Sequence, residues 1–336
     1  MKLLSLSDVL AAENRIADYI VNTPVVTCDF LNQRLKNKLF FKLESHQKIG
    51  AFKSRGALNH LLYFKEINQL PKKVVSVSSG NHAQAVAYAC KMLDIEALIY
   101  TSRITSSLKI RATKMLGAQV IVTETRKEAN ILALEKAEKE GYHFLHPYDD
   151  DLVIAGQGTA CLEALKTIDQ KVDAVFIPCG GGGLPSGTYL AAQHELAKGA
   201  QIFACEPEIA NDAALSLKRG EIYQFNDSPN TIADGARTLS ISPRTFEYLK
   251  KIDGIIEASE ESIIYWTQWL HYLLKTTVEP TSAMAMAGCF NWIKDNKIID
   301  RNILIIISGG NISAESYRQI WDKDYLIDVP TISNGN

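Results

Sequence analysis

Short runs of consecutive apolar residues alternate with helix-forming segments along almost the whole of this 336-residue chain. Apolar runs without polar alternation are typical of strands that helices cover on both faces. Connections this short favour parallel strands, because a helix carries the chain back across the sheet. The sequence therefore predicts an α/β fold. The strands that we expect are 39–44, 74–78, 96–100, 119–123, 174–178, 201–205 and 302–308.

Four segments between these strands have apolar residues at helical spacing or are rich in helix formers. They are residues 7–20, 83–93, 127–140 and 261–275, and Ser7 is the expected N-cap of the first. A chain of this length buries a large core and has room for two domains.

The distribution of charge excludes several classes of partner. The chain has 36 basic and 38 acidic residues, well interspersed, so no basic stripe predicts a nucleic-acid partner. The apolar runs are far shorter than the roughly 20 residues that span a bilayer. No secretory signal follows Met1, so we expect a cytoplasmic protein without a membrane partner. The six scattered cysteines are expected to be free core thiols. They are Cys28, Cys90, Cys161, Cys179, Cys205 and Cys289.

Lys53 stands between a predicted strand and a helical run. The helix macrodipole disfavours a cation at a helix start. A lysine held neutral as an imine would not conflict with that rule. The alternative is a surface lysine in a loop.

The segment Ser78-Ser79-Gly80-Asn81-His82 also joins a predicted strand to a helix. Its small residues would let backbone N–H groups at the helix N-terminus face a carboxylate or phosphate. Asn81 could hydrogen-bond a phenolate-like oxygen, and either serine could relay a proton. The alternative is an N-capping turn without a ligand.

Four consecutive glycines follow the strand 174–178, and a backbone without side chains can curl around a tetrahedral anion. We therefore predict a phosphate site there. A competing hypothesis is a dinucleotide-binding unit, with Glu206 ending the next strand. No GxGxxG spacing exists, however, because the third glycine is replaced by Pro185 or Ser186 in the two possible registers. The glycines are Gly180, Gly181, Gly182 and Gly183.

Two further positions have side chains suited to a ligand. Ser308 ends an apolar strand, where α/β sheets bind ligands in the crevice beyond the carboxyl ends. Glu206 and Asp212, with a backbone carbonyl between them, could hold a hard divalent cation through oxygen ligands. The alternatives are an ordinary strand-ending turn and two solvated acids.

In this order, the motifs resemble the serine/threonine dehydratase and serine racemase family of fold-type-II pyridoxal-phosphate (PLP) enzymes. Each motif alone is weak, but the ordered set is specific and spans nearly the whole chain. The matching segments are GAFKSRGA at 50–57, SSGNH at 78–82, VIAGQGT at 153–159, the four glycines, DG at 234–235, EPT at 279–281 and SGGN at 308–311.

The resemblance implies two open, twisted, mostly parallel sheets with flanking helices, and PLP in the cleft between two domains. Residues 74–148 would form a small mobile domain, 1–73 and 149–330 a large PLP-binding domain, and 331–336 a tail. The family also implies a homodimer.

The resemblance implies a role for each matching residue around the cofactor. Lys53 would carry PLP as a Schiff base and remove the α-proton of the substrate. Phe52 would pack on the cofactor, the four glycines and the Leu184 amide would hold its phosphate, and Asn81 would bind the ring oxygen. Ser308 would meet the pyridine nitrogen, and a hydroxyl at that position suits elimination or racemisation better than transamination.

The resemblance also implies substrate and metal contacts. Ser78, Ser79 and His82 would hold the carboxylate of a small amino acid, and Ser79 matches the opposite-face proton donor of the racemase branch. The divalent cation, Mg²⁺ or Ca²⁺, would be held by Glu206, Ala210 and Asp212.

The implied reaction is L-threonine or L-serine dehydration, which gives a 2-oxo acid and ammonia by α,β-elimination. Serine racemisation and elimination from 3-hydroxyaspartate are alternatives on the same scaffold. Where the racemase branch has an arginine near the β-substituent, this chain has Ala129, and Arg126 is out of register. The substrate therefore stays open.

Overall fold

Two separate β-sheets organise the computed structural model, which describes residues 3–78 and 80–332. The larger sheet has six strands in the order β1-β2-β10-β7-β8-β9, and the smaller has four in the order β5-β4-β3-β6. The larger contains β1 (Val25–Thr27), β2 (Lys38–Leu43), β7 (Ala174–Pro178), β8 (Gln201–Pro207), β9 (Gly254–Ala258) and β10 (Asn302–Ile307). The smaller contains β3 (Lys73–Val77), β4 (Glu96–Ser102), β5 (Gln119–Thr123) and β6 (His143–Phe144).

Both sheets are almost entirely parallel, which confirms the predicted fold class. The exception among the described strands is β1, which runs antiparallel to β2 and pairs Val25 with Lys42. Strand β10 lies in the middle of the larger sheet, parallel to β2 on one side and β7 on the other. All four strands of the smaller sheet lie between residues 73 and 144. The domain limits predicted from the sequence stay a prediction.

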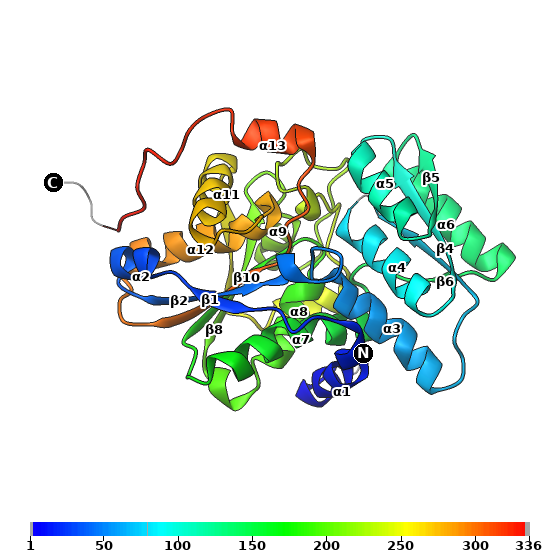
Figure 1. The fold of residues 1–336 in the computed structure, drawn as a ribbon, viewed down its shortest axis with the longest axis horizontal. Coiled ribbons are helices and arrows are strands. Elements are labelled where there is room, and N and C mark those ends of the chain that lie inside the picture. Colours follow the sequence, from blue (N-terminus) through cyan, green and yellow to red (C-terminus); the bar gives the residue numbers. More distant parts are fainter. Residues whose placement is uncertain (1–2, 79, 333–336) are drawn as a thin grey trace.

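Helices surround the two sheets. They are α1 (Leu6–Ile16), α2 (Asp29–Leu35), α3 (Lys53–Glu66), α4 (Asn81–Met92), α5 (Ser107–Met115), α6 (Arg126–Glu140), α7 (Asp151–Ile168), α8 (Gly183–Ala191), α9 (Asp212–Arg219), α10 (Pro243–Leu249), α11 (Glu260–Leu274), α12 (Pro280–Asn296) and α13 (Ala314–Ile320). Short 3₁₀ turns are η1 (Ala17–Tyr19), η2 (Glu44–His46), η3 (Glu195–Ala197) and η4 (Asp234–Ala236). Figure 1 shows the smaller sheet and α4, α5 and α6 as a lobe beside the larger sheet.

The start of the first helix differs from the sequence prediction. Its N-cap is Ser5 and not Ser7, because Asp8 lies three residues after Ser5 and accepts hydrogen bonds from the backbone N–H and Oγ of Ser5 at 2.8 and 2.9 Å. Three residues after Ser7 stands Leu10, whose side chain has no acceptor. The helix also ends at Ile16, before the 3₁₀ turn η1.

The apolar strand runs are explained by cores on both faces of the larger sheet. Neighbouring residues of β2 point to opposite faces. Leu39 and Phe41 pack with residues of α11 and α12, whereas Phe40 packs with residues of α7 and α8. All six cysteines are free and buried in the described chain, as predicted. Within the described residues, every helix is too short or too polar to cross a membrane.

A buried ionic network anchors the beginning of α3. The guanidinium of Arg55 donates to Glu44 at 2.7 and 2.8 Å and to Glu163 of α7 at 3.0 Å. Lys42 of β2 also pairs with Glu163. Removing one partner would leave an uncompensated buried charge, which is strongly destabilising. The network therefore fixes the helix turn that contains Lys53.

Candidate active site

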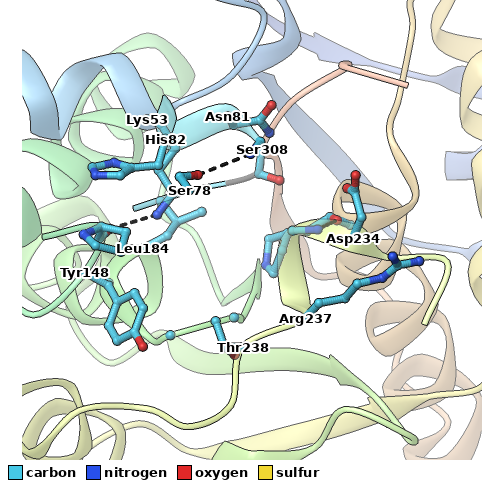
Figure 2. Close-up of a pocket in the computed structure, with 18 of the residues that line it drawn as sticks. Lys53, Ser78, Asn81, His82, Tyr148, Leu184, Asp234, Arg237, Thr238 and Ser308 are labelled. Carbon is cyan, nitrogen blue, oxygen red and sulfur yellow. Dashed lines mark hydrogen bonds between the residues drawn. The ribbon is translucent and has the colours of Figure 1, made fainter. Parts of the chain in front are cut away.

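One cavity collects nearly all the residues that the sequence singles out for cofactor binding. It is lined from the larger sheet by the glycine turn and Ser308, and from the smaller sheet by Ser78, Asn81 and His82 (Figure 2). The carboxyl ends of β3, β7 and β10 all point to it, as expected for an open α/β sheet. The other lining residues include Phe52, Lys53, Lys109, Arg126, Pro147, Tyr148, Leu184, Asp234, Gly235, Arg237, Thr238, Glu279 and Thr281.

Lys53 is the first residue of α3, and its amine reaches into the cavity (Figure 2). The Nζ atom donates a hydrogen bond to the backbone oxygen of Pro147 at 2.9 Å. Burial lowers the pKa of the amine to about 8, because a low-dielectric site disfavours the charged form. A neutral amine is the form that attacks a carbonyl or accepts a proton.

The four glycines form a turn that has no room for side chains. Strand β7 ends at Pro178 and α8 begins at Gly183. A Cβ on Gly180 would lie 2.7 Å from the oxygen of Gly235, and one on Gly181 would overlap the ring of Tyr148. Gly182 has a φ of +86°, which strains other residues. The turn leaves the N-terminus of α8 at the cavity, where backbone N–H groups suit an anion.

The amide of Asn81 is held at both ends. Its Nδ2 atom donates to the two Glu279 carboxylate oxygens at 2.9 and 3.2 Å, and its Oδ1 accepts from Asn311 Nδ2 at 2.8 Å. Glu279 is fully buried, and burial raises its pKa to about 7. In the sequence, Glu279 belongs to the EPT motif, but nothing near it in the chain indicates its role. Only its long-range contact with Asn81 shows what it does.

Ser308 comes directly after β10 and is buried. Its Oγ lies 3.0 Å from the Oγ of Ser282, which also donates to the Gly309 oxygen at 2.8 Å. No carboxylate is among the hydrogen-bond partners of Ser308 in the described chain. The position thus presents a hydroxyl fixed by a second hydroxyl.

The segment after β3 places at the cavity both described residues that were predicted to hold the substrate carboxylate, Ser78 and His82. Ser78 accepts a hydrogen bond from the Gly80 N–H at 3.2 Å (Figure 2). His82 is buried, its Nε2 donates to the Leu145 oxygen at 3.3 Å, and its Nδ1 has no partner in the described chain. Burial, followed by the nearby Lys53, holds the pKa of His82 well below its ordinary value, so the ring is neutral. Ser79 lies outside the described residues.

Three cationic side chains that the sequence did not assign line the same cavity. Lys109 of α5 forms an ion pair with Asp234. Arg237 donates twice to the Thr231 oxygen, at 2.8 and 2.6 Å. Arg126 donates from Nη1 to the Arg237 oxygen at 2.6 Å, and no carboxylate of the described residues pairs with it. Arg126 therefore places an unneutralised guanidinium at the cavity.

Glu206 and Asp212 lie close together and are fully buried. They are not among the residues that line the cavity. Glu206 accepts from the N–H groups of Ala213 and Ala214 at 3.2 and 3.0 Å, and Oδ2 of Asp212 has no partner in the described chain. Burial raises the pKa of both acids, of Asp212 to about 7, and the charge of Asp212 adds to the effect on Glu206. Within residues 3–78 and 80–332, no group of three or more His, Cys, Asp or Glu side chains could hold a metal. Ala210 is buried in the connection between β8 and α9.

Known proteins are similar to this chain over most of its length. Residues 16–309 match the model of the family described as pyridoxal-phosphate dependent enzyme. An L-threo-3-hydroxyaspartate ammonia-lyase from Saccharomyces cerevisiae is 39% identical, over 92% of this chain and 94% of its own. A serine racemase from Schizosaccharomyces pombe is 40% identical, over 92% and 95%.

Solved structures of similarly named enzymes have the same fold as this chain. A threonine deaminase from T.th. superposes with a TM-score of 0.84 at 38% identity, and the match covers 92% of this chain and 99% of the deaminase chain. The serine racemase from Dictyostelium discoideum gives the same TM-score, identity and coverage.

Proposed function

The chain belongs to the pyridoxal-phosphate dependent enzymes, and we propose that it is an ammonia-lyase for small 3-hydroxy amino acids, with L-serine and L-threonine as the preferred substrates. The observation that carries the proposal is the meeting of Lys53, the glycine turn and Ser308 in one cavity. The cavity thus contains the groups that PLP needs, which are a reactive amine, an anion site and a hydroxyl. The products are a 2-oxo acid and ammonia.

The residues of the cavity fit the cofactor. The glycine turn has no room for side chains, and its backbone N–H groups would hold the phosphate together with the amide of Leu184. Phe52 would pack on the ring, Asn81 would donate to its oxygen, and Ser308 would meet its nitrogen. When bound, PLP supplies the electron sink that stabilises the charge left by a departing α-proton.

The amine of Lys53 does the proton transfer in this proposal. Its lowered pKa makes the neutral form available near neutral pH, and neutral Nζ accepts the α-proton of the substrate. The Pro147 oxygen fixes the direction of the amine. After the β-hydroxyl leaves as water, the enamine product hydrolyses to the 2-oxo acid and ammonia.

Ser308 limits the type of reaction. Its hydroxyl, bonded to Ser282, offers no anion that would keep a ring nitrogen protonated. Elimination and racemisation are favoured over transamination for this reason. Ser78 and His82 would help to position the substrate carboxylate, together with Ser79.

Arg126 favours a second candidate, elimination from 3-hydroxyaspartate. This substrate carries a second carboxylate, and Arg126 has donors at the cavity without a carboxylate partner among the described residues. Arginine binds a carboxylate with charge-assisted hydrogen bonds. The relative from Saccharomyces cerevisiae is named for that activity. Serine racemisation is the remaining alternative, supported by the relative from Schizosaccharomyces pombe and dependent on Ser79.

The proposal extends to a divalent cation, Mg²⁺ or Ca²⁺, at Glu206, Ala210 and Asp212. Two carboxyl groups that are buried close together, one with an oxygen that has no partner in the described chain, would supply oxygen ligands to a cation, which would favour their ionised forms. We also propose a cytoplasmic homodimer, which the family resemblance supports.

Product analysis tests the proposed activity. Purified, PLP-loaded protein is supplied separately with L-serine, L-threonine and L-threo-3-hydroxyaspartate, and 2-oxo acid, ammonia and D-serine are measured. Formation of 2-oxo acid and ammonia in equal amounts from L-serine or L-threonine supports the ammonia-lyase. D-serine as the main product would replace it with the racemase.

A further inference from the structure

A cluster of three titratable side chains lies beside the cavity and has no role in the proposed reaction. His60 of α3 is buried, and its Nδ1 lies 3.0 Å from Oδ1 of Asp150. Its Nε2 lies 2.6 Å from Nε2 of His143 on β6. The ring of Phe64 packs against both imidazoles, with centroid distances of 5.1 and 4.8 Å.

The cluster fastens both ends of one wall of the cavity to α3. His143 and Asp150 begin and end residues 143–150, and this segment contributes Pro147 and Tyr148 to the cavity. His60 follows Lys53 by seven residues, about two helical turns, on the same face of α3. The helix that positions the Lys53 amine is therefore also the helix that holds the segment of its acceptor, Pro147.

The short contact between the two imidazoles contains one proton. Burial raises the pKa of Asp150, but the hydrogen bond from His60 and its charge, together with the Val153 N–H and Arg244, outweigh burial and leave the pKa below its usual value. Asp150 is thus a carboxylate, and it accepts from Nδ1–H of His60. In the neutral pair the Nε2 of His60 is then an acceptor, and Nε2–H of His143 is the donor.

We propose that His60 and His143 are positioning residues that share one proton and hold residues 143–150 so that the Pro147 oxygen stays opposite the Lys53 amine. The expected effect on kcat rests on the proposed function, whereas the shared proton does not. Neither imidazole is among the residues that line the cavity, so both act through the wall segment.

The contact between the two imidazoles requires that one of the two Nε2 atoms carry no proton. When both Nε2 atoms carry protons, the contact is lost. Burial, and then His60, lower the pKa of His143, so loss of the contact by protonation of His143 requires a pH below the ordinary histidine value of about 6.5.

Two further imidazoles interact electrostatically with the cluster. His82 of α4, which lines the cavity, interacts with His60, and the pKa of His82 lies well below the ordinary histidine value, mainly because the ring is buried. His146, within the wall segment, interacts with Asp150, and burial lowers the pKa of His146 to about 4. Burial therefore favours the neutral form of both rings.

The charged groups on the neighbouring helices leave Asp150 as the anion of the cluster. Arg244 of α10, which forms ion pairs with Asp149 and Asp151, lowers the pKa of Asp150 through its positive charge. On α1, Arg15 forms an ion pair with Glu66 of α3. Asp150 therefore supplies the negative charge in direct contact with His60.

The test compares His143→Gln with His194→Gln, a matched change in the partly buried histidine beside η3. We expect His143→Gln to lower kcat for the best substrate by about tenfold with KM within about twofold, since a small displacement of a reacting group costs this much or more. The pH profile of His143→Gln should also lack the fall in kcat at acidic pH that wild type and His194→Gln share. Wild-type kcat and an unchanged pH profile in His143→Gln would overturn the proposal.

A second measurement needs neither turnover nor a folded variant. Nitrogen-edited proton NMR of the wild type should show one strongly deshielded proton coupled to an imidazole Nε2, which disappears at acidic pH while the protein stays folded. Absence of that proton at neutral pH would also overturn the proposal. A failure of the proposed activity would leave this proton in place, so the two failures are distinguishable.

Discussion

The amine of Lys53 lies 2.9 Å from the carbonyl oxygen of Pro147, and the two residues come from different parts of the molecule. Lys53 begins α3 after the larger sheet strand β2, whereas Pro147 follows β6 of the smaller sheet. Both residues line the cavity. The reactive amine is thus oriented by a segment whose position depends on the smaller sheet.

Lys53 should react at a lower pH than an ordinary lysine. Its pKa is lowered to about 8, and only the neutral amine attacks an aldehyde, so the reactive form increases as pH rises through about 8. We expect the rate of covalent PLP capture by PLP-free protein to have its midpoint there. Stopped-flow absorbance measures it. A midpoint near the ordinary lysine value of about 10.4 would contradict the assigned environment.

Gly181→Ala should damage the phosphate site. The new methyl group would overlap the ring of Tyr148, and relieving this overlap costs about 1–3 kcal/mol. We expect PLP affinity to fall by about tenfold or more, measured by fluorescence titration. Gly254→Ala is the control, because its Cβ would make only ordinary contact with Phe203 at 3.7 Å. Equal PLP affinity in both variants would refute the role of the turn.

Arg126→Gln should discriminate between substrates. Hydrogen bonds to a charged group contribute about 1.5–3 kcal/mol, or roughly 10–150-fold in binding. We therefore expect KM for L-threo-3-hydroxyaspartate to rise by about that factor and KM for L-serine to stay within about twofold. Steady-state kinetics with Lys114→Gln, an exposed change on α5, serves as control. If KM rises equally for both substrates, Arg126 does not bind the second carboxylate. A parallel loss of PLP affinity would then assign Arg126 to the phosphate.

Mg²⁺ or Ca²⁺ should stabilise the protein through Glu206 and Asp212. A cation that binds only the folded state raises Tm as its occupancy increases. We expect a rise in Tm with millimolar cation in wild type and none in Asp212→Asn, measured by differential scanning calorimetry. A similar rise in both proteins would place the cation elsewhere.

The strands and the local motifs could be predicted from the sequence, for a physical reason. An apolar run such as 174–178 and a turn such as the four glycines are continuous in the chain, and the structure has a strand over the same residues, Ala174–Pro178. The N-cap of α1 lies two residues before the predicted one, because the side chain of Asp8 selects Ser5 as its partner. Local patterns thus predict elements, but the ends of those elements depend on single side chains.

The contacts that orient the site could not be predicted, because their partners are far apart in the sequence. Glu279 holds Asn81 across 198 residues, and Arg126 reaches the Arg237 backbone across 111. A buried carboxylate such as Glu279 looks like any helix-starting acid until the fold brings an amide to it. The same is true of His60 and His143, which have no common motif.

The most direct test of the central claim is 2-oxo acid formation by PLP-loaded wild type and Lys53→Ala, with L-serine and L-threonine as substrates. The account predicts 2-oxo acid and an equal amount of ammonia from wild type, and a loss of at least about a thousandfold in Lys53→Ala, because proton transfer and covalent attachment both require Nζ. Comparable turnover by Lys53→Ala, or no product from wild type with PLP bound, would contradict it.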